Sequence, residues 1–378
     1  MRVRLAAFVA ATFVACVSAV ATAEPMDPAL ERLVLTPACH QPPSGSFGEW
    51  DDTPNPSWDP NFDPLNPING SLACAPDNVS FKKLISQYAF AFAPTAMHSA
   101  RTTGYGGFHL SLQADYTSIS SGAQYWKRGT QGPVDPSNNA SSVVNNSPQS
   151  LLQLYSLKFR KSFGFGLELT GLVGFMPKTS IISGGADVRL SLLEGFRTGV
   201  GGILPDVAVG GGVRSITGTP QFQLTVASLD VQISKPLPIQ DSMILTPYIG
   251  YQYMWAFGDS GLVDLTPGTD ALRYCNYAGQ NLPGNPDRDG KERFDGQPIC
   301  NGGSPLDFNN NVVFKSVRVE RQRFILGLNY RLEMVMLGGQ FLMDLVPPED
   351  AQNSEADKQA LKGEERQFTL SFELGAMF

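Results

Sequence analysis

Only three histidines, His40, His98 and His109, offer an imidazole for acid–base chemistry. Ser111 and Asp115 follow His109 two and six residues further on. A histidine and a carboxylate on one strand face form half of a catalytic relay, whose third member need not be near in sequence. We nevertheless expect a structural histidine. The sequence thus predicts a non-enzymatic protein with no catalytic residue and no cofactor, and a hydrolase is the alternative.

The run Asn285-Pro286-Asp287-Arg288-Asp289-Gly290 resembles the start of a calcium loop. Oxygen side chains at every second position before a glycine turn suit a hard cation. The pattern then departs, because Glu292 stands where an apolar residue is usual and Gly296 stands where Glu is usual. The sequence therefore predicts no metal site. Asn285, Asp287 and Asp289 are the candidate calcium ligands if one exists.

Four cysteines, Cys39, Cys74, Cys275 and Cys300, remain if Cys16 is lost with a signal peptide. An even number in an oxidising compartment points to disulfides, and three pairings are open in principle. Each of two loop-like segments holds two of them, which favours Cys39–Cys74 and Cys275–Cys300. Their spacings match no zinc pattern.

The first 23 residues have the three parts of a secretory signal peptide. Arg2 and Arg4 precede an apolar run from Leu5 to Val14, and Ala21-Thr22-Ala23 forms a cleavage site. The alternative is a lipoprotein box at Phe13-Val14-Ala15-Cys16, in which phenylalanine fits the first position poorly. No other apolar run approaches the roughly 18 residues that a helical membrane span needs. We therefore expect an exported chain.

The residues Gln367 to Phe378 alternate strictly between polar and apolar side chains. This period of two predicts a β-strand with one apolar face. The strand resembles the closing strand of bacterial outer-membrane β-barrels, which ends on an aromatic residue. That resemblance implies an all-β transmembrane barrel in the outer membrane, with Phe378 as the signal for the barrel assembly machinery. The alternative is an edge strand of a soluble sandwich.

Composition agrees with a barrel. Charged residues make up 17% of the chain, and the mean hydropathy is −0.10. Near-neutral hydropathy is expected where lipid-facing and lumen-facing residues alternate. The net charge of −7 argues against nucleic acid as a partner. We expect outer-membrane lipid as a partner, and the sequence leaves the oligomeric state open.

The chain divides into a signal peptide (1–23), a Pro- and Asn-rich extension (24–104) and a barrel (105–378). Spacing of Phe81, Leu84, Ile85 and Tyr88 predicts a short amphipathic helix that ends before Pro94. It would pack in or under the barrel, or serve only as a connection. The expected strands are Gly106–Thr117, Leu151–Arg160, Gly164–Phe175, Ala186–Glu194, Pro205–Ile216, Gln221–Ser234, Met243–Phe257, Val312–Arg331, Met334–Leu345 and Gln367–Phe378.

These ten strands form an antiparallel up-and-down barrel, and twelve is the alternative. With the extension on the periplasmic side, every odd-numbered connection faces outside, and three of these are long. The even-numbered ones are all short, as periplasmic turns are. The connection Gly258–Asn311 is the longest, so we expect it to be the main external contact surface, open to an epitope tag near Gly290.

Aromatic residues near strand ends are expected to form interfacial girdles: Tyr116, Tyr125, Trp126, Tyr155, Phe159, Phe175, Tyr248, Trp255, Phe257 and Phe378.

A ten-strand lumen is narrow and is usually filled by side chains. The inward charged positions expected here are Lys158, Arg160, Glu168, Asp187, Arg189, Arg318, Glu320 and Arg331. An N-terminal segment before a barrel resembles porin-like proteins and transporters of the long-chain fatty acid type, as does the run Phe92-Ala93-Pro94-Thr95-Ala96-Met97. The Asn of that family's Asn-Pro-Ala run is absent and ten strands are too few, so no binding residues carry over. The leading hypothesis is passive passage or uptake of small solutes, including apolar ones. The alternative is a structural or surface-recognition barrel.

Overall fold

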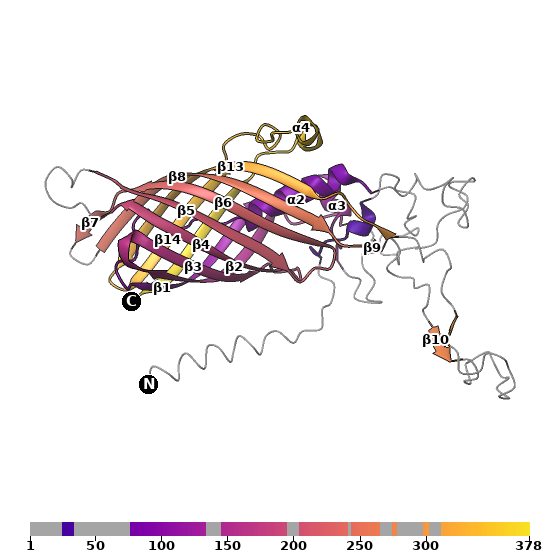
Figure 1. The fold of residues 1–378 in the computed structure, drawn as a ribbon, viewed down its shortest axis with the longest axis horizontal. Coiled ribbons are helices and arrows are strands. Elements are labelled where there is room, and N and C mark those ends of the chain that lie inside the picture. Colours follow the sequence, from indigo (N-terminus) through magenta and orange to yellow (C-terminus); the bar gives the residue numbers. More distant parts are fainter. Residues whose placement is uncertain are drawn as a thin grey trace.

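The computed structural model describes residues 25–33, 76–133, 145–194, 204–240, 243–264, 274–277, 298–301 and 311–378. Within them the dominant feature is a closed antiparallel barrel of ten strands (Figure 1). Each barrel strand pairs with its neighbours in the chain, and the last strand pairs with the first. The barrel strands are β1 (Phe108–Ser118), β2 (Leu151–Ser162), β3 (Leu167–Phe175), β4 (Ile182–Leu193), β5 (Asp206–Thr217), β6 (Phe222–Ser234), β8 (Met243–Ser260), β13 (Val317–Leu332), β14 (Val335–Asp344) and β15 (Phe368–Met377).

The prediction of ten strands is confirmed, and the alternative of twelve is wrong. The remaining elements lie outside the barrel wall, at its ends or, for one helix, inside it. Between β8 and β13 there are two short ribbons, β9 (Val263–Asp264) with β12 (Asn311–Val312) and β10 (Tyr274–Tyr277) with β11 (Pro298–Asn301). The others are β7 (Leu237–Gln240), which pairs with β8, and the helices η1 (Leu30–Arg32), α2 (Asn78–Phe92), α3 (Gln124–Arg128), η3 (Gly164–Gly166) and α4 (Glu355–Leu361). No helix in the described part of the chain is long and apolar enough to cross a membrane.

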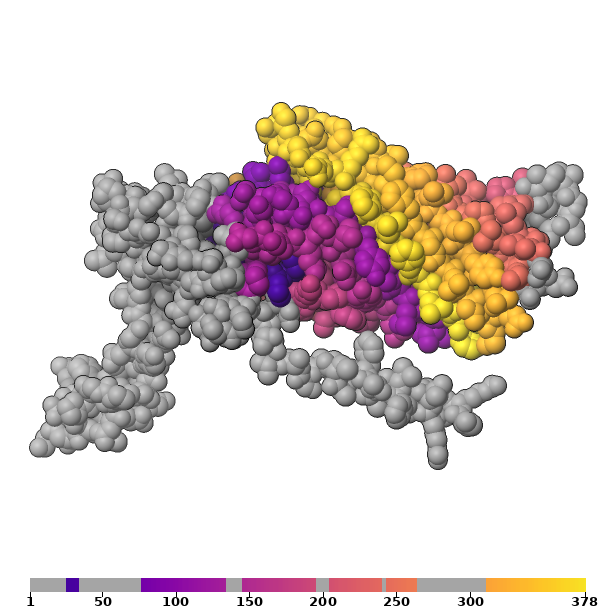
Figure 2. All heavy atoms as spheres, turned by 180° about the vertical axis from the view of Figure 1, so that it is seen from behind, coloured from indigo at the N-terminus to yellow at the C-terminus, as the bar shows by residue number. Residues whose placement is uncertain are grey.

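The seam of the barrel lies between β15 and β1. Thr117 pairs with Thr369 at one end and His109 with Met377 at the other. The backbones of Phe108 and Phe378 then exchange two hydrogen bonds of 2.7 and 2.9 Å. Figure 2 shows the yellow β15 beside the purple β1 on the outer wall. Complete pairing leaves no exposed strand edge, which an isolated sheet would have.

Alternation along the strands divides the wall into two faces, as predicted. On β15 the side chains of Thr369, Ser371 and Glu373 are buried toward the lumen, while Phe372 and Leu374 are each 55% exposed on the outside. The period of two produces this arrangement on each strand. Apolar side chains therefore cover the outer wall even though the chain as a whole is not hydrophobic.

The two ends of the barrel differ in the length of their connections. One end carries the connections β1–β2, β3–β4, β5–β6, β8–β13 and β14–β15, which include the long segments. The other end carries the connections β2–β3, β4–β5, β6–β8 and β13–β14, together with the start of β1 and Phe378. None of these is as long as the three long connections of the first end. Short turns are periplasmic and long loops extracellular in bacterial barrels. We call these the external end and the periplasmic end.

The predicted helix is α2, and it lies inside the barrel at the external end (Figure 1). Asp77 caps its first turn by accepting a 3.0 Å hydrogen bond from the Ser80 amide. It ends at Phe92 because Pro94 forces Ala93 into an extended conformation. Eleven of its fifteen residues are buried, on every side of the helix. Such burial is explained by the wall that surrounds the helix.

The aromatic girdle is only partly as predicted. Outward-facing Tyr116, Tyr155, Phe175 and Phe372 form a row of ring contacts with centroids 5.8–6.3 Å apart. Three of the expected girdle residues instead point into the molecule: Tyr125, Trp126 and Tyr248 are each at most 9% exposed. Tyr125 and Trp126 belong to α3, which packs on α2, and Tyr248 lies on the lumen face of β8.

Candidate functional site: the filled lumen

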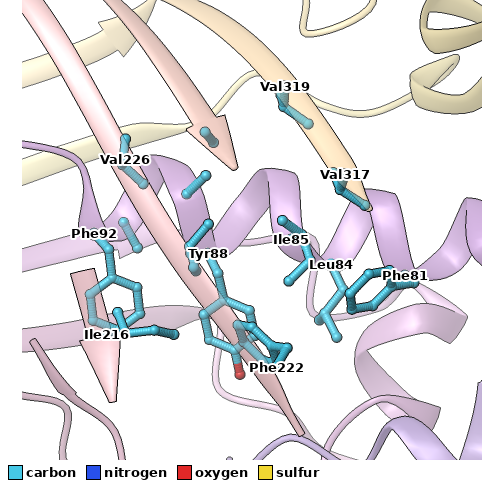
Figure 3. Close-up of a cluster of buried hydrophobic side chains, with 14 of the residues drawn as sticks. Phe81, Leu84, Ile85, Tyr88, Phe92, Ile216, Phe222, Val226, Val317 and Val319 are labelled. Atoms are coloured by element: carbon cyan, nitrogen blue, oxygen red, sulfur yellow. The ribbon is translucent and has the colours of Figure 1, made fainter. Parts of the chain in front are cut away.

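The external half of the lumen is an apolar core built around α2. Tyr88 is central to it, with ring centroids 4.9 Å from Trp126 of α3 and 5.6 Å from Phe222 of β6. Phe81 lies 4.8 Å from Phe314, measured between ring centroids. Figure 3 shows α2 side chains directed at inward residues of β5, β6 and β13. Apolar side chains of the wall and of α2 therefore pack together around the helix.

Three glycines of the wall lie close to this lumen segment. A Cβ atom at Gly258 would lie 2.7 Å from Cγ2 of Ile85, which is closer than side chains can approach. A Cβ at Gly212 would lie 3.2 Å from Cβ of Pro94, and one at Gly338 would lie 3.1 Å from Cε of Met97. Only at Gly258 on β8 does the segment inside the barrel alone leave no room for a side chain. Gly212 is crowded more closely by Asp187 of the wall, and Gly338 equally by Asn329.

The periplasmic half of the lumen is polar and holds the extended segment that follows α2. Each carbonyl from Pro94 to Ser99 accepts a hydrogen bond from a lumen side chain. The five donor residues come from five different strands, so the segment is held from several sides of the wall. The pairs are Gln252 to Pro94 (3.1 Å), Gln340 to Thr95 (2.6 Å), Gln232 to Ala96 (2.8 Å), Lys158 to Met97 (3.2 Å), and Arg189 to His98 (3.4 Å) and Ser99 (3.2 Å).

Two arginines of β13 connect the two halves. Arg323 donates to the carbonyl of Phe90 at 3.2 Å and also to that of Pro94. Arg321 donates to the Ser86 hydroxyl at 2.8 Å and pairs with Asp344. Both guanidinium groups lie about 5 Å from the centre of the Phe90 ring, at 4.9 and 5.1 Å. The wall thus grips the last turns of α2 through charge-assisted hydrogen bonds.

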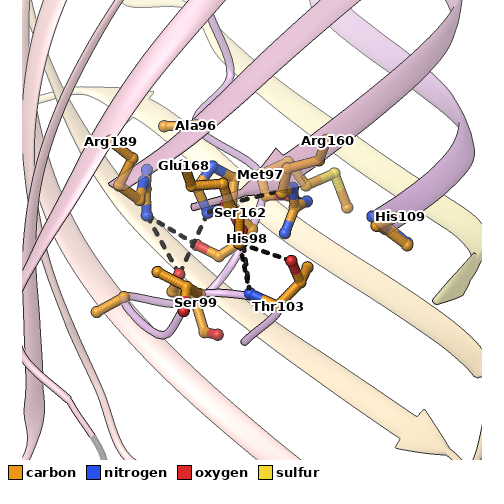
Figure 4. A network of polar contacts seen from close by, with 12 residues as sticks. Ala96, Met97, His98, Ser99, Thr103, His109, Arg160, Ser162, Glu168 and Arg189 are labelled. Atoms are coloured by element: carbon orange, nitrogen blue, oxygen red, sulfur yellow. Dashed lines mark hydrogen bonds and ion pairs between the residues drawn. The ribbon is translucent and has the colours of Figure 1, made fainter. Parts of the chain in front are cut away.

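Buried acidic groups compensate the buried cations. The Lys158 ammonium lies 2.8 Å from Glu373, and Arg189 lies 3.0 Å from Asp230. Near the periplasmic end, the Thr103 amide donates to Ser162 and to Glu168, at 3.1 and 3.0 Å. Figure 4 shows Thr103, Ser162 and Glu168 close to His98 and Ser99. Buried charges are tolerated only when paired in this way.

A cap of short elements closes the external end. Arg32 of η1 donates to the carbonyls of Thr130 and Gln131, at 3.2 and 3.0 Å. The Asn145 amide joins Thr130 to the carbonyl of Pro25. Lys82 of α2 pairs with Asp357 of α4. Cap, apolar core and polar segment thus follow one another inside the barrel from the external end to the periplasmic end.

The residues expected to resemble half of a relay do not meet. His109 faces the lumen as predicted and is fully buried, but neither of its ring nitrogens has a hydrogen-bond partner among the described residues. Its Nδ1 atom lies 4.0 Å from a carboxylate oxygen of Glu373. Ser111 donates to Glu373, and Asp115 accepts from Gln113. Within the described residues, His109 therefore forms no hydrogen bond with a serine or an aspartate.

Five of the expected inward charges, Lys158, Arg160, Glu168, Asp187 and Arg189, do face the lumen. The prediction is wrong for Arg318 and Glu320, whose side chains point outward, where Arg318 lies over the Phe257 ring. Arg331 is exposed at the periplasmic end. The two arginines that do point inward on β13, Arg321 and Arg323, were missed. Burial alternates along β13 with its odd-numbered residues inward, and this register explains the error.

Several predictions fall outside the described residues: the signal peptide, Cys39, Cys74, the calcium candidates Asn285, Asp287 and Asp289, and the tag position Gly290. For the second cysteine pair, the structure describes only the backbone. Cys275 stands directly opposite Cys300 in the β10–β11 ribbon. Their disulfide stays a prediction, to which this register is favourable.

The outer wall decides where this barrel resides. Outward-facing Leu112, Leu229, Leu326 and Phe372 are each more than half exposed, at 62, 58, 51 and 55%. A continuous apolar belt on a closed barrel is stable in hydrocarbon and costly in water. Even-stranded barrels with short turns at one end are the outer-membrane type. The chain is a bacterial outer-membrane β-barrel. The outer membrane is therefore its location, as predicted.

The sequence matches no protein-family model, and a search of curated proteins found no match. Solved structures of similar fold include Ail, the attachment invasion locus protein of Yersinia pestis, at 9% identity, covering 73% of this chain and 100% of that chain with a TM-score of 0.24. Omp33 of Acinetobacter baumannii is 8% identical over 72% of this chain and 97% of its own, with a TM-score of 0.23. The translocator domain of the autotransporter NalP from Neisseria meningitidis is 9% identical over 73% and 89%, with a TM-score of 0.27. At these values the similarities carry no argument about function.

Proposed function

We propose that the protein is a closed, non-catalytic barrel that acts through its external surface as a structural or recognition protein. The observation that carries this proposal is the row of six successive carbonyls, Pro94 to Ser99, that all accept hydrogen bonds from the lumen wall. A segment held at each residue is a fixed part of the fold. A solute has no route past it while these bonds hold.

The free energy of these contacts supports a lasting closure. A buried hydrogen bond contributes about 0.5–1.5 kcal/mol, and one from a charged donor about 1.5–3 kcal/mol. Removing the segment would also leave Arg189 and Lys158, both at most 4% exposed, without part of their hydrogen bonding. Their ion pairs with Asp230 and Glu373 would remain, but buried donors that lose hydrogen-bond partners are unfavourable. The closed state is therefore favoured over a state in which the segment has left the lumen.

Passage of small solutes, the leading hypothesis from the sequence, would require this segment to move. Recognition requires no such movement, because the external connections and the cap already lie at the barrel mouth. Rigid barrels commonly carry function on such loops. A recognition role is thus the better match to a filled lumen.

Single-channel recording in a planar lipid bilayer separates the two roles. We expect the purified protein to give no conductance steps. Arg323→Gln removes the donors to Phe90 and Pro94 and should give intermittent openings. Arg318→Gln, on the outward face of the same strand, is the matched control and should stay silent. Steady channels from the unmodified protein, equal to those of the Arg323 variant, would contradict the proposal and favour passage.

A further inference from the structure

Residues Pro25 to Leu33 lie at the external end of the barrel. The Met26 amide donates to the carbonyl of Lys178 at 3.1 Å, in the β3–β4 connection. The Ala29 amide donates to Gly129 at 2.9 Å, and the Leu30 amide donates to the Gln221 side chain at 3.1 Å. These partners belong to three different connections of the external end. All three contacts therefore place Pro25 to Leu33 at the external end.

The chain reaches the opposite end before β1 begins. Thr102 donates to Glu194, just after β4, and Thr103 contacts Ser162 at the end of β2. The segment Asn78–Thr103 therefore crosses the whole lumen once. A helix of fifteen residues rises about 22 Å, and the extended residues after it add about 3.3 Å each. This length is ample for an apolar band of about 25 Å.

Leu33 and Asp77, which flank residues outside the described part of the chain, lie side by side. The Asp77 amide donates to the Leu33 carbonyl at 2.8 Å, so the two ends of this segment are joined. Asp77 is also the cap of α2 at the external end of the lumen. Nothing in the ten-strand topology required this, because β1 starts at the periplasmic end. The periplasmic placement expected for the extension does not hold for Pro25 to Leu33.

We infer that the segment from Leu33 to Asp77 is displayed on the outer face of the membrane, with the lumen-crossing stretch Asn78–Thr103 as its anchor. The barrel then has a further function, which is to present a piece of its own N-terminal region outside the cell. Filling of the lumen and display follow from the same path of the chain. The inference goes beyond the proposed closure, because a closed barrel would hold equally well with this segment in the periplasm.

Epitope tags in the full-length protein test this placement on intact cells. The test tag is inserted after Gly45, between the two joined ends. One reference tag follows Asn353 in the β14–β15 connection at the external end. The other is placed at Phe165, in the β2–β3 turn at the periplasmic end, where the side chain is fully exposed. The heat-dependent shift of folded barrels on gels confirms that each tagged protein is assembled.

We expect antibody to label the Gly45 and Asn353 tags on intact cells at comparable levels. The Phe165 tag should be labelled only after the outer membrane is permeabilised. Labelling of the Gly45 tag only after permeabilisation, alongside Phe165, would overturn the inference. The conductance result is independent, so failure of the display and failure of the closure can be told apart.

Discussion

At the scale of single residues, the barrel's interior charges are satisfied by the chain's own backbone. Arg189 contacts two carbonyls of the lumen segment, the Gln232 side chain and Asp230. Without these partners a guanidinium at this depth would be unstable. The lumen segment and the wall therefore stabilise each other, and neither is an accessory to the other.

Glu364, which follows α4 in the β14–β15 connection, makes the stability of the protein depend on pH. Burial raises the pKa of Glu364 to about 7, although Arg321 lies 3.7 Å away and opposes the rise. In the unfolded chain the carboxyl loses its proton near pH 4. The folded protein keeps that proton to a higher pH, so the stabilisation is complete below about pH 4. It is lost as pH rises through about 7, by up to roughly 3 kcal/mol.

We therefore expect Glu364→Gln to remove part of the fall in stability between pH 5 and pH 8. Unfolding midpoints in detergent should match the unmodified protein at pH 5 and exceed it at pH 8. Glu365→Gln changes the exposed neighbouring residue and should follow the unmodified protein at both values. Parallel pH profiles for the Glu364 variant and the unmodified protein would refute a titrating carboxyl at this position.

The sequence predicts inward charges well where one face of a strand is plainly apolar. His109 on β1 and Lys158 on β2 are examples, because their neighbours alternate between polar and lipid-facing types. The pattern fails on β13, where Val319 is buried inward against α2 and Leu326 is exposed on the lipid side. Both faces of this strand are apolar at different depths. Periodicity alone cannot then separate lumen from lipid.

At the scale of elements, the sequence predicts that α2 is a helix but does not predict its position inside the barrel. Its capping residue and Pro94 are local signals, whereas burial on all sides depends on strands more than a hundred residues away. Local spacing carries no information about such contacts. A helix that is buried all round and still contains Lys82, Ser86 and Gln87 becomes understandable only inside a partly polar lumen.

Tyr88→Ala should weaken the hold of α2 because the ring contacts with Trp126 and Phe222 are lost. Truncating a large buried aromatic side chain costs about 3–5 kcal/mol. We expect a lower unfolding midpoint in detergent. Val79→Ala, at a position 49% exposed on the same helix, should change it little. Equal effects of the two variants would show that α2 is not packed in the lumen.

The β10–β11 ribbon makes the second cysteine pair testable. Residues directly opposite each other in an antiparallel pair have Cα atoms about 4.5–5.5 Å apart, within the range of a disulfide. Cys275 and Cys300 hold such positions. A bond between them would stabilise the segment by roughly 3–4 kcal/mol in the chain-entropy model.

Peptide mapping under non-reducing conditions should recover Cys275 and Cys300 in one linked peptide. Cys275→Ser should free Cys300 and leave any Cys39–Cys74 linkage as it was. Linkage of Cys275 to either N-terminal cysteine, or four free thiols in envelope-derived protein, would rule the predicted pairing out.

At the scale of the whole molecule, the sequence predicts the barrel but not the segment that lies inside it. Ten amphipathic strands and the difference between long and short connections are local patterns, and both are confirmed. The segment Asn78–Thr103 is held in the lumen by hydrogen bonds between residues up to 279 positions apart. The need for a glycine at position 258 is explained by its contact with Ile85, and this contact is not visible in the sequence.

The claim that α2 occupies the lumen is tested most directly by a cysteine crosslink between helix and wall. A Cβ atom at position 258 would lie 3.6 Å from Cβ of Ile85, which suits a disulfide. Protein carrying Ile85→Cys and Gly258→Cys, assembled in the outer membrane and mildly oxidised, should show a reducible shift on a denaturing gel. Val79→Cys with Gly258→Cys is the control and should show none. Absence of the crosslink in the folded first variant, or equal yield in both, would contradict the account.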